Sequence, residues 1–131
     1  MIGLDSNLLI RYVTQDDPVQ SPVVTRLFET LTPEEPGFVP LVALIEMVWV
    51  LKSFYDASRI QIEQVIEMLL RARGIVVEQR ALVWMALHGY SRGNADFGDY
   101  LIECSAREVG CESTLTFDRD AANTAGMKLL R

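Results

Sequence analysis

Five carboxylates in this chain are candidates for a catalytic or metal-binding role, because each lies within or directly beside an apolar segment. They are Asp5, Glu46, Asp96, Asp99 and Asp118. A carboxylate that leaves water without a partner costs on the order of several kcal/mol, so such groups are normally paired, protonated or bound to a metal. No Lys, Arg or His lies beside Asp5 or Glu46 in the sequence. We therefore expect desolvated acids that need a distant partner or a divalent cation.

The segments around these acids predict alternating strands and helices. Strands are expected at 2–5, 38–39, 75–77, 113–117 and 127–130. Helices are expected at 6–14, from Pro18 and Pro22 to about residue 31, from Pro40 through Glu46, and at 61–73, 81–90 and 96–109. The helix at 61–73 has the clearest pattern, because its apolar residues recur at the spacing of one helix face.

This alternation predicts an α/β fold in one domain over residues 1–131. We expect three layers, with a central parallel sheet of about four to five short strands and helices on both faces. In such sheets the active crevice lies at the carboxyl ends of the strands. Asp5 and Asp118 end two strands, and Asp96 and Asp99 begin a helix, so one crevice is expected to receive them. Clustered carboxylates repel unless cations bind, and hard oxygen ligands favour Mg²⁺ or Mn²⁺ over zinc.

The composition excludes several classes of protein. The longest apolar stretch, 41–51, is shorter than the roughly 20 residues of a membrane span. The start of the chain lacks the basic region of a signal peptide, so we expect a cytoplasmic protein. Cys104 and Cys111 have neither a zinc spacing nor a disulfide framework and are expected to be buried, reduced thiols. The net charge of −6 argues against broad electrostatic binding of nucleic acid, so phosphate contacts must be local or metal-mediated.

Four motifs follow one another along the chain. They are Leu4-Asp5-Ser6-Asn7-Leu8-Leu9, Ala43-Leu44-Ile45-Glu46, Ala95-Asp96-Phe97-Gly98-Asp99-Tyr100-Leu101-Ile102 and Leu115-Thr116-Phe117-Asp118-Arg119-Asp120. Together they resemble the motifs of PIN-domain ribonucleases, and most closely those of VapC-type toxins from type II toxin–antitoxin systems. The resemblance covers essentially the whole chain, and all four motifs in order are a specific signal.

The resemblance implies a metal-dependent endoribonuclease whose acids hold one or two Mg²⁺ ions, with Mn²⁺ as a substitute, and activate water for attack on RNA. By position, the four family acids match Asp5, Glu46, Asp99 and Asp118. The metal is then held by Asp5, Asp99 and Asp118, while Glu46 is a further ligand or orients the attacking water.

Two further positions match polar residues that help orient the acids in the family, namely Asn7 and Thr116. Ser6 stands where Thr is frequent, which is a minor departure because either hydroxyl can donate a hydrogen bond. The side chains of Arg11, Arg92 and Arg119 are candidates for contacts with RNA phosphates.

Structural explanations for the same acids stay open. Asp96 and Asp99 lie three residues apart on one helical turn, so both can face the crevice, yet Asp96 suits a helix N-cap equally well. We expect Asp99 to be the third ligand and Asp96 a supporting acid. Asp5 and Asp118 can also be N-caps. Glu46 is harder to explain structurally, because its neighbours on the predicted helix are apolar.

Two other functions are weighed against the nuclease. A phosphatase that forms an aspartyl-phosphate would need an acid two residues after Asp5, where the chain has Asn7. A catalytically silent PIN-like interaction module would be indicated by the loss of one of the acids, and none is lost.

Partners are expected as well. The apolar Trp49, Phe54, Tyr55 and Met68 exceed what a regular buried stripe needs, which predicts a homodimer. The resemblance implies a small antitoxin, for which an acidic cleft offers an anchor to an Arg or Lys. The substrate is then RNA, and no membrane is involved.

Overall fold

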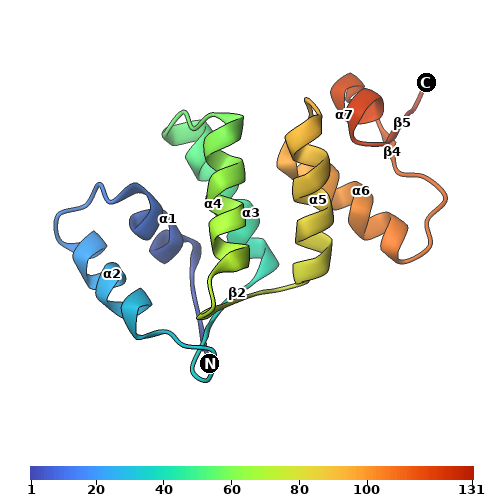
Figure 1. The fold of residues 1–131 in the computed structure, drawn as a ribbon. Coiled ribbons are helices and arrows are strands. Elements are labelled where there is room, and N and C mark those ends of the chain that lie inside the picture. Colours follow the sequence, from blue (N-terminus) through green and yellow to red (C-terminus); the bar gives the residue numbers. More distant parts are fainter. The chain divides into compact units, whose positions relative to one another are not determined.

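The computed structural model describes residues 1–131, which form two compact units, Met1–Glu78 and Gln79–Arg131. Both units combine helices with short parallel strands (Figure 1). None of the helices combines the length and the apolar composition that a bilayer span requires.

The first unit contains three strands and four helices. They are β1 (Ile2–Gly3), α1 (Ser6–Thr14), α2 (Gln20–Thr30), β2 (Gly37–Val39), α3 (Leu41–Phe54), α4 (Arg59–Arg71) and β3 (Ile75–Val77). The strands are parallel in the order β1-β2-β3, with Ile2 paired to Gly37 and Gly37 to Ile75. Parallel strands need a crossover between them, and the helices α1 to α4 supply it.

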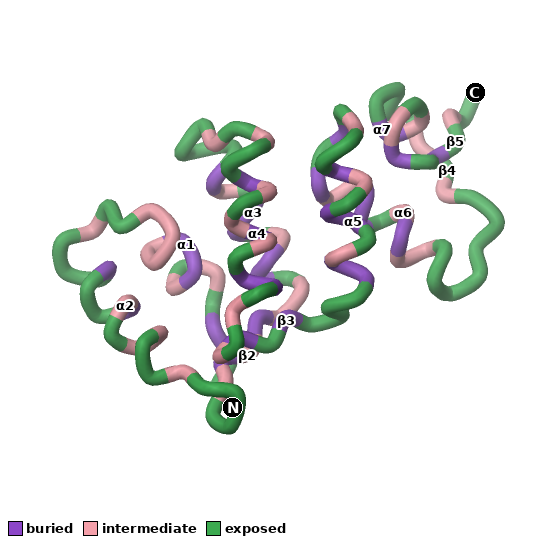
Figure 2. The backbone as a smooth tube through the Cα atoms, viewed as in Figure 1, coloured by how far each residue is buried: buried purple, intermediate pink, exposed green.

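The core of the first unit lies between the sheet and its helices (Figure 2). Its fully buried side chains include Leu9 of α1, Met47 of α3 and Ile66 of α4. A capping box starts α4, in which Ser58 accepts from the backbone of Gln61 and the Gln61 side chain accepts from the Ser58 backbone. This box satisfies backbone donors that the first helical turn leaves open.

The second unit contains three helices and two strands. They are α5 (Arg80–Arg92), α6 (Phe97–Glu108), β4 (Leu115–Thr116), α7 (Arg119–Thr124) and β5 (Lys128–Leu129). Helices α5 and α6 pack together through aromatic rings, since Tyr90 meets Phe97 edge-on at 5.8 Å and Tyr100 at 6.2 Å between ring centroids. Strands β4 and β5 form a parallel pair.

The predicted α/β class is confirmed, and the predicted elements appear in order. Helix α1 has the predicted bounds, because Asp5 caps its start and the left-handed backbone of Gln15 ends it. Two details differ from the prediction. The strands form one sheet of three and one of two, because β4 and β5 pair with each other. Helix α7 was not predicted, because its six residues are too few to show a helical period.

The expectation of two buried thiols is half wrong. Cys104 lies on the inner side of α6 and is buried, whereas Cys111 follows Gly110 beyond the end of that helix and is exposed. Both cysteines are free.

Candidate functional site

The structure joins two of the predicted acids through one serine. Asp5 follows β1 and occupies the N-cap of α1, where its Oδ1 accepts from the Ser6 backbone N–H at 2.7 Å. The Ser6 hydroxyl donates to Oε2 of Glu46 at 2.8 Å and lies 3.5 Å from Asp5 Oδ1. One hydroxyl therefore contacts the carboxylates of both acids, although they are far apart in sequence.

Backbone pairing explains why these acids meet. The chain between β1 and α1 is fixed by the Leu4 N–H, which donates to the Phe38 carbonyl oxygen at 2.8 Å. Strand β2 runs through Pro40 directly into α3, so the helix that carries Glu46 starts beside the end of β1. The pairing of β1 with β2 and the direct passage from β2 into α3 thus bring these two side chains together, a grouping that the sequence indicated only through the family resemblance.

The expectation that the acids are desolvated is wrong for this pair. Asp5 and Glu46 are both exposed, and so are Asp96 and Asp118, while Asp99 is half-buried. Glu46 projects from α3 on the same exposed side as Val42 and Trp49, opposite the buried Leu44 and Met47. The apolar neighbours of Glu46 on its side of α3 are therefore exposed to solvent and do not bury the carboxylate.

The Asp5 and Glu46 pair fits a hard cation. None of the ion pairs of the first unit includes either acid. The hydrogen bonds to Ser6 use Asp5 Oδ1 and Glu46 Oε2, which leaves Asp5 Oδ2 and Glu46 Oε1 available as ligands. Two carboxylates that share one hydroxyl repel each other, and a divalent cation with oxygen ligands removes that repulsion.

In the second unit, Asp96 and Asp99 share the start of α6. Asp96 occupies the N-cap and Asp99 the third helical position of a capping box, in which Oδ2 of Asp99 accepts from the Asp96 backbone N–H at 3.3 Å. The N-cap role considered for Asp96 is therefore present. This bond takes up one of the roughly four acceptor sites of the Asp99 carboxylate.

Asp118 is the N-cap of α7. Its Oδ1 accepts from the backbone N–H groups of Asp120 at 2.8 Å and Ala121 at 3.2 Å. The Thr116 hydroxyl accepts from the Asp118 backbone N–H at 3.0 Å, a contact that fits the supporting role predicted for Thr116. Both capping bonds use Oδ1 of Asp118, so its Oδ2 remains available as a ligand.

Four of the five predicted acids thus form two pairs, one in each unit, and Asp118 stands at the start of α7. Asp5 lies with Glu46, and Asp96 lies with Asp99. Within either unit, no three His, Cys, Asp or Glu side chains assemble into a complete metal site. Asn7 is exposed on the first turn of α1, where it borders a hollow of about 250 Å³ between α1 and α2, and its orienting role stays a prediction.

Arg11, a candidate for phosphate contact, is instead engaged within the first unit. Its Nε donates to the Gln20 side chain at 2.9 Å, and its guanidinium lies 3.6 Å from Asp16 and 3.9 Å from Asp17. The hydroxyl of Tyr55 donates to Asp16 at 2.7 Å, and this bond lowers the pKa of Asp16 below its ordinary value. These contacts tie α1, α2 and the end of α3 together.

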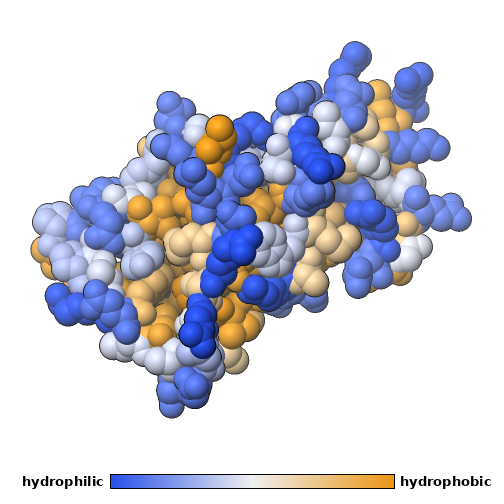
Figure 3. All heavy atoms as spheres, in the orientation of Figure 1, coloured by the Kyte–Doolittle hydropathy of each residue, from blue (hydrophilic) through white to orange (hydrophobic).

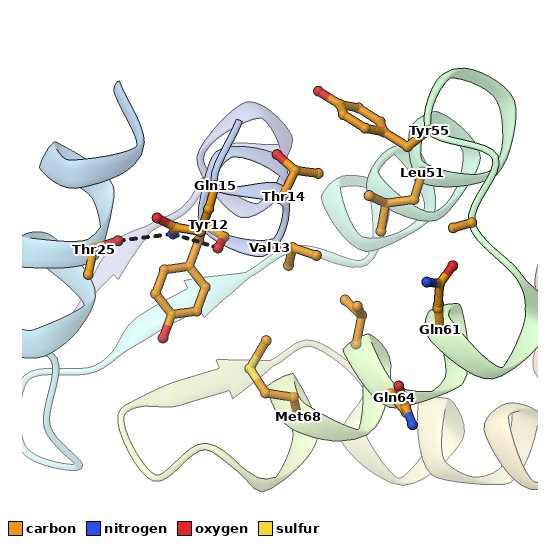
Figure 4. A pocket seen from close by; sticks show the side chains of 12 residues that line it. Tyr12, Val13, Thr14, Gln15, Thr25, Leu51, Tyr55, Gln61, Gln64 and Met68 are labelled. Carbon is orange, nitrogen blue, oxygen red and sulfur yellow. Dashed lines mark hydrogen bonds between the residues drawn. The ribbon is translucent and has the colours of Figure 1, made fainter. Parts of the chain in front are cut away.

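A groove of about 740 Å³ opens beside this network, and sequence reasoning did not find it (Figure 4). It is lined by α1, α2, α3 and α4, with Tyr12, Tyr55 and Met68 among its side chains. Figure 3 shows hydrophobic atoms gathered between α2 and α4 on this face of the first unit. The surplus of apolar residues at Tyr55 and Met68 was the available signal. None of the five predicted acids lines the groove.

Comparison with known proteins gives two findings. Residues 2–127 match the PIN domain family model. The chain is also similar to a VapC ribonuclease from Aquifex aeolicus (strain VF5), with 28% identity over 118 residues that cover 88% of this chain and 86% of that protein. The family match runs through both units and includes all five predicted acids.

Proposed function

Since this chain belongs to the PIN domain family, we propose that it is a Mg²⁺-dependent endoribonuclease and the toxin of a toxin–antitoxin pair. We further propose that its two units form one PIN domain and act on the same substrate. The observation that carries the proposal is the Ser6 hydroxyl, which contacts the carboxylates of both Asp5 and Glu46 and leaves one oxygen of each for a cation.

The proposed ligands of the metal are Asp5, Asp99 and Asp118. Each keeps one carboxylate oxygen on a backbone N–H, and Asp5 and Asp118 have their Oδ2 atoms to offer. Glu46, oriented by the Ser6 hydroxyl, is a further ligand or accepts a proton from the attacking water. Held by these residues, Mg²⁺ or Mn²⁺ would supply a lowered pKa for that water and positive charge beside the phosphate.

Family membership and donor chemistry support this assignment together. Carboxylate oxygens are the ligands that Mg²⁺ and Mn²⁺ prefer. A capping role does not compete with a ligand role, because a carboxylate has two oxygens and about four lone-pair sites. Asp96 is proposed as a supporting acid, since it holds the turn that carries Asp99.

Cleavage of a labelled RNA by the purified protein tests the proposal. Cleavage is expected with Mg²⁺ or Mn²⁺ and none in EDTA, because clustered carboxylates have little catalytic power alone. An Asp5→Asn protein purified in parallel reports contaminating nuclease. Metal-independent cleavage would rule out the metal mechanism. No cleavage of total cellular RNA under any metal would favour a catalytically silent interaction module.

An antitoxin is the proposed protein partner. The exposed Asp5 and Glu46 form an acidic pair that takes part in none of the ion pairs of the first unit. A partner's Arg or Lys can occupy this pair in place of the cation. Coexpression with a small protein encoded beside this chain should restore growth, and Mg²⁺ should weaken the complex. A complex whose affinity does not respond to Mg²⁺ would contradict this mode of inhibition. Because its substrate is RNA, we propose that the protein acts in the cytoplasm.

A homodimer is proposed through the exposed side of α3. Val42 is 71% exposed, Trp49 60% and Phe54 71%, and the rings of Trp49 and Phe54 contact each other at 5.5 Å between centroids. Large apolar side chains so exposed on one helix are typical of an interface. Light scattering at micromolar concentration should give a dimer, and Trp49→Arg should give a monomer. A monomeric wild-type protein would refute the proposal.

A further inference from the structure

Two hydroxyl groups join α6 and α7 in the second unit. The Tyr100 hydroxyl on the first turn of α6 lies 3.0 Å from the Thr124 hydroxyl at the end of α7. Thr124 Oγ1 donates to the Asp120 carbonyl oxygen at 2.9 Å, so Tyr100 supplies the proton of the bond between the two side chains.

The same threonine holds the chain that leads into α6. Its Oγ1 accepts from the backbone N–H groups of Asn94 and Ala95, both at 3.2 Å. The Ala95 N–H is shared with the Tyr100 hydroxyl at 3.4 Å. These two residues directly precede Asp96, so the threonine fixes the entry to the capping box.

Tyr100 also packs closely against the end of α5. A Cβ added at Gly93 would overlap the Tyr100 hydroxyl, and one added at Gly89 would lie 2.8 Å from the Tyr100 ring. The absence of a side chain at these two positions lets Tyr100 pack this closely against the end of α5. Tyr100 is buried, so its hydroxyl needs these partners.

We propose that Thr124 and Tyr100 are positioning residues for metal binding. Their hydroxyls set the start of α6, which carries Asp96 and Asp99, relative to α7, which Asp118 begins. The inference rests on the proposed function, because it assumes that Asp99 and Asp118 hold the same metal. Neither hydroxyl is proposed as a ligand of the metal.

The test compares Thr124→Val, which removes the hydroxyl at nearly constant shape, with Thr124→Ser, which keeps it. Mn²⁺ binding to the full-length protein is titrated by electron paramagnetic resonance. Thr124→Val and Tyr100→Phe should each weaken Mn²⁺ binding about fivefold, the scale of one lost hydrogen bond. Thr124→Ser should stay within about twofold of wild type. In RNA cleavage, more Mg²⁺ should restore most of the lost rate.

A control separates positioning from general damage. Thr30→Val removes a hydroxyl that bonds only within α2, to the Leu27 carbonyl oxygen, and should not change Mn²⁺ binding. Amide exchange at Asn94 and Ala95 should quicken in Thr124→Val and not in Thr124→Ser. If Thr124→Val does not fold, Tyr100→Phe decides the question.

The outcomes distinguish the two proposals. Wild-type Mn²⁺ affinity in the folded Thr124→Val or Tyr100→Phe protein would overturn the positioning role and leave the nuclease proposal intact. A wild-type protein that neither binds Mn²⁺ nor cleaves RNA would overturn the proposed function and the positioning role with it.

Discussion

In the first unit, Ser6 and Glu46 meet across 40 positions of sequence through a side-chain hydroxyl, and Asp5 lies beside them. In the second unit, Asp99 and Asp118 are held by backbone N–H groups within a few residues of themselves. The first arrangement depends on the sheet that aligns β1 with β2, whereas in the second each acid is held by the start of its own helix.

This contrast decides which substitutions can change RNA cleavage without changing the stability of the fold. At a helix N-cap, Asn accepts the same backbone hydrogen bonds as Asp but carries no charge, so an Asp→Asn change keeps the cap and removes a proposed metal ligand. In the first unit, a substitution of Ser6 serves the same purpose. It removes the hydroxyl that contacts Asp5 and Glu46 and leaves both carboxylates in place.

The largest effect is expected from Asp118→Asn. RNA cleavage should fall by about 10²-fold or more, the scale for losing one key electrostatic group, while thermal unfolding in EDTA stays near wild type. Asp118→Ala should lose both activity and about 1 kcal/mol of stability. An Asp118→Asn protein that cleaves at the wild-type rate would mean that Asp118 is a cap and nothing more.

Ser6→Ala should have an intermediate effect on cleavage. Loss of the hydroxyl frees the Glu46 carboxylate, and about tenfold in rate is expected from one hydrogen bond to a charged group. Ser6→Thr keeps the donor and should stay close to wild type. Both rates are measured at one subsaturating Mg²⁺ concentration, and equal rates for Ser6→Ala and wild type would remove the serine from the mechanism.

Asp99→Asn should act on metal binding and hardly on the metal-free fold. The remaining amide oxygen still accepts from the Asp96 N–H, so the melting temperature in EDTA should match wild type. The rise in melting temperature on adding Mg²⁺ should shrink, because a ligand stabilises a protein according to its affinity for the folded state. A mutant that melts well below wild type in EDTA would show that Asp99 is mainly structural.

The smallest effect is expected at acid pH in the first unit. The pKa of Asp16 lies below its ordinary value of 3.8, mainly because the Tyr55 hydroxyl bonds the carboxylate. Its stabilising contribution is therefore complete above about pH 3.8 and is lost as pH falls through the lower folded value. Asp16→Asn should make the melting temperature fall less steeply between about pH 5 and pH 3. Tyr55→Phe should do the same, and an unchanged slope in both would contradict the assignment.

Sequence patterns predicted most elements of the fold because the helices carry regular apolar faces and end at Pro, Gly or a capping residue. They placed Asp5 at the end of a strand, and the family resemblance grouped it with Glu46, whereas in the structure the pairing of β1 with β2 brings the two acids together. They missed α7, whose six residues carry no period, and the groove beside α1, which arises from packing between four helices. The sequence pattern predicted a buried Glu46, and the side chain is exposed. An apolar segment with one acid has the same sequence pattern whether its apolar residues face the core or the solvent.

The pairing of the first sheet has a consequence for how the chain folds. Strand β2 is the middle strand, and it pairs with residues near position 2 on one side and near position 75 on the other. Each pairing closes a long loop, and topologies with such distant contacts fold slowly, whereas the second unit is built around the neighbouring helices α5 and α6. During synthesis this sheet cannot be completed until Val77 has left the ribosome. More than half of the chain must therefore be made before the sheet beside Asp5 and Glu46 is complete.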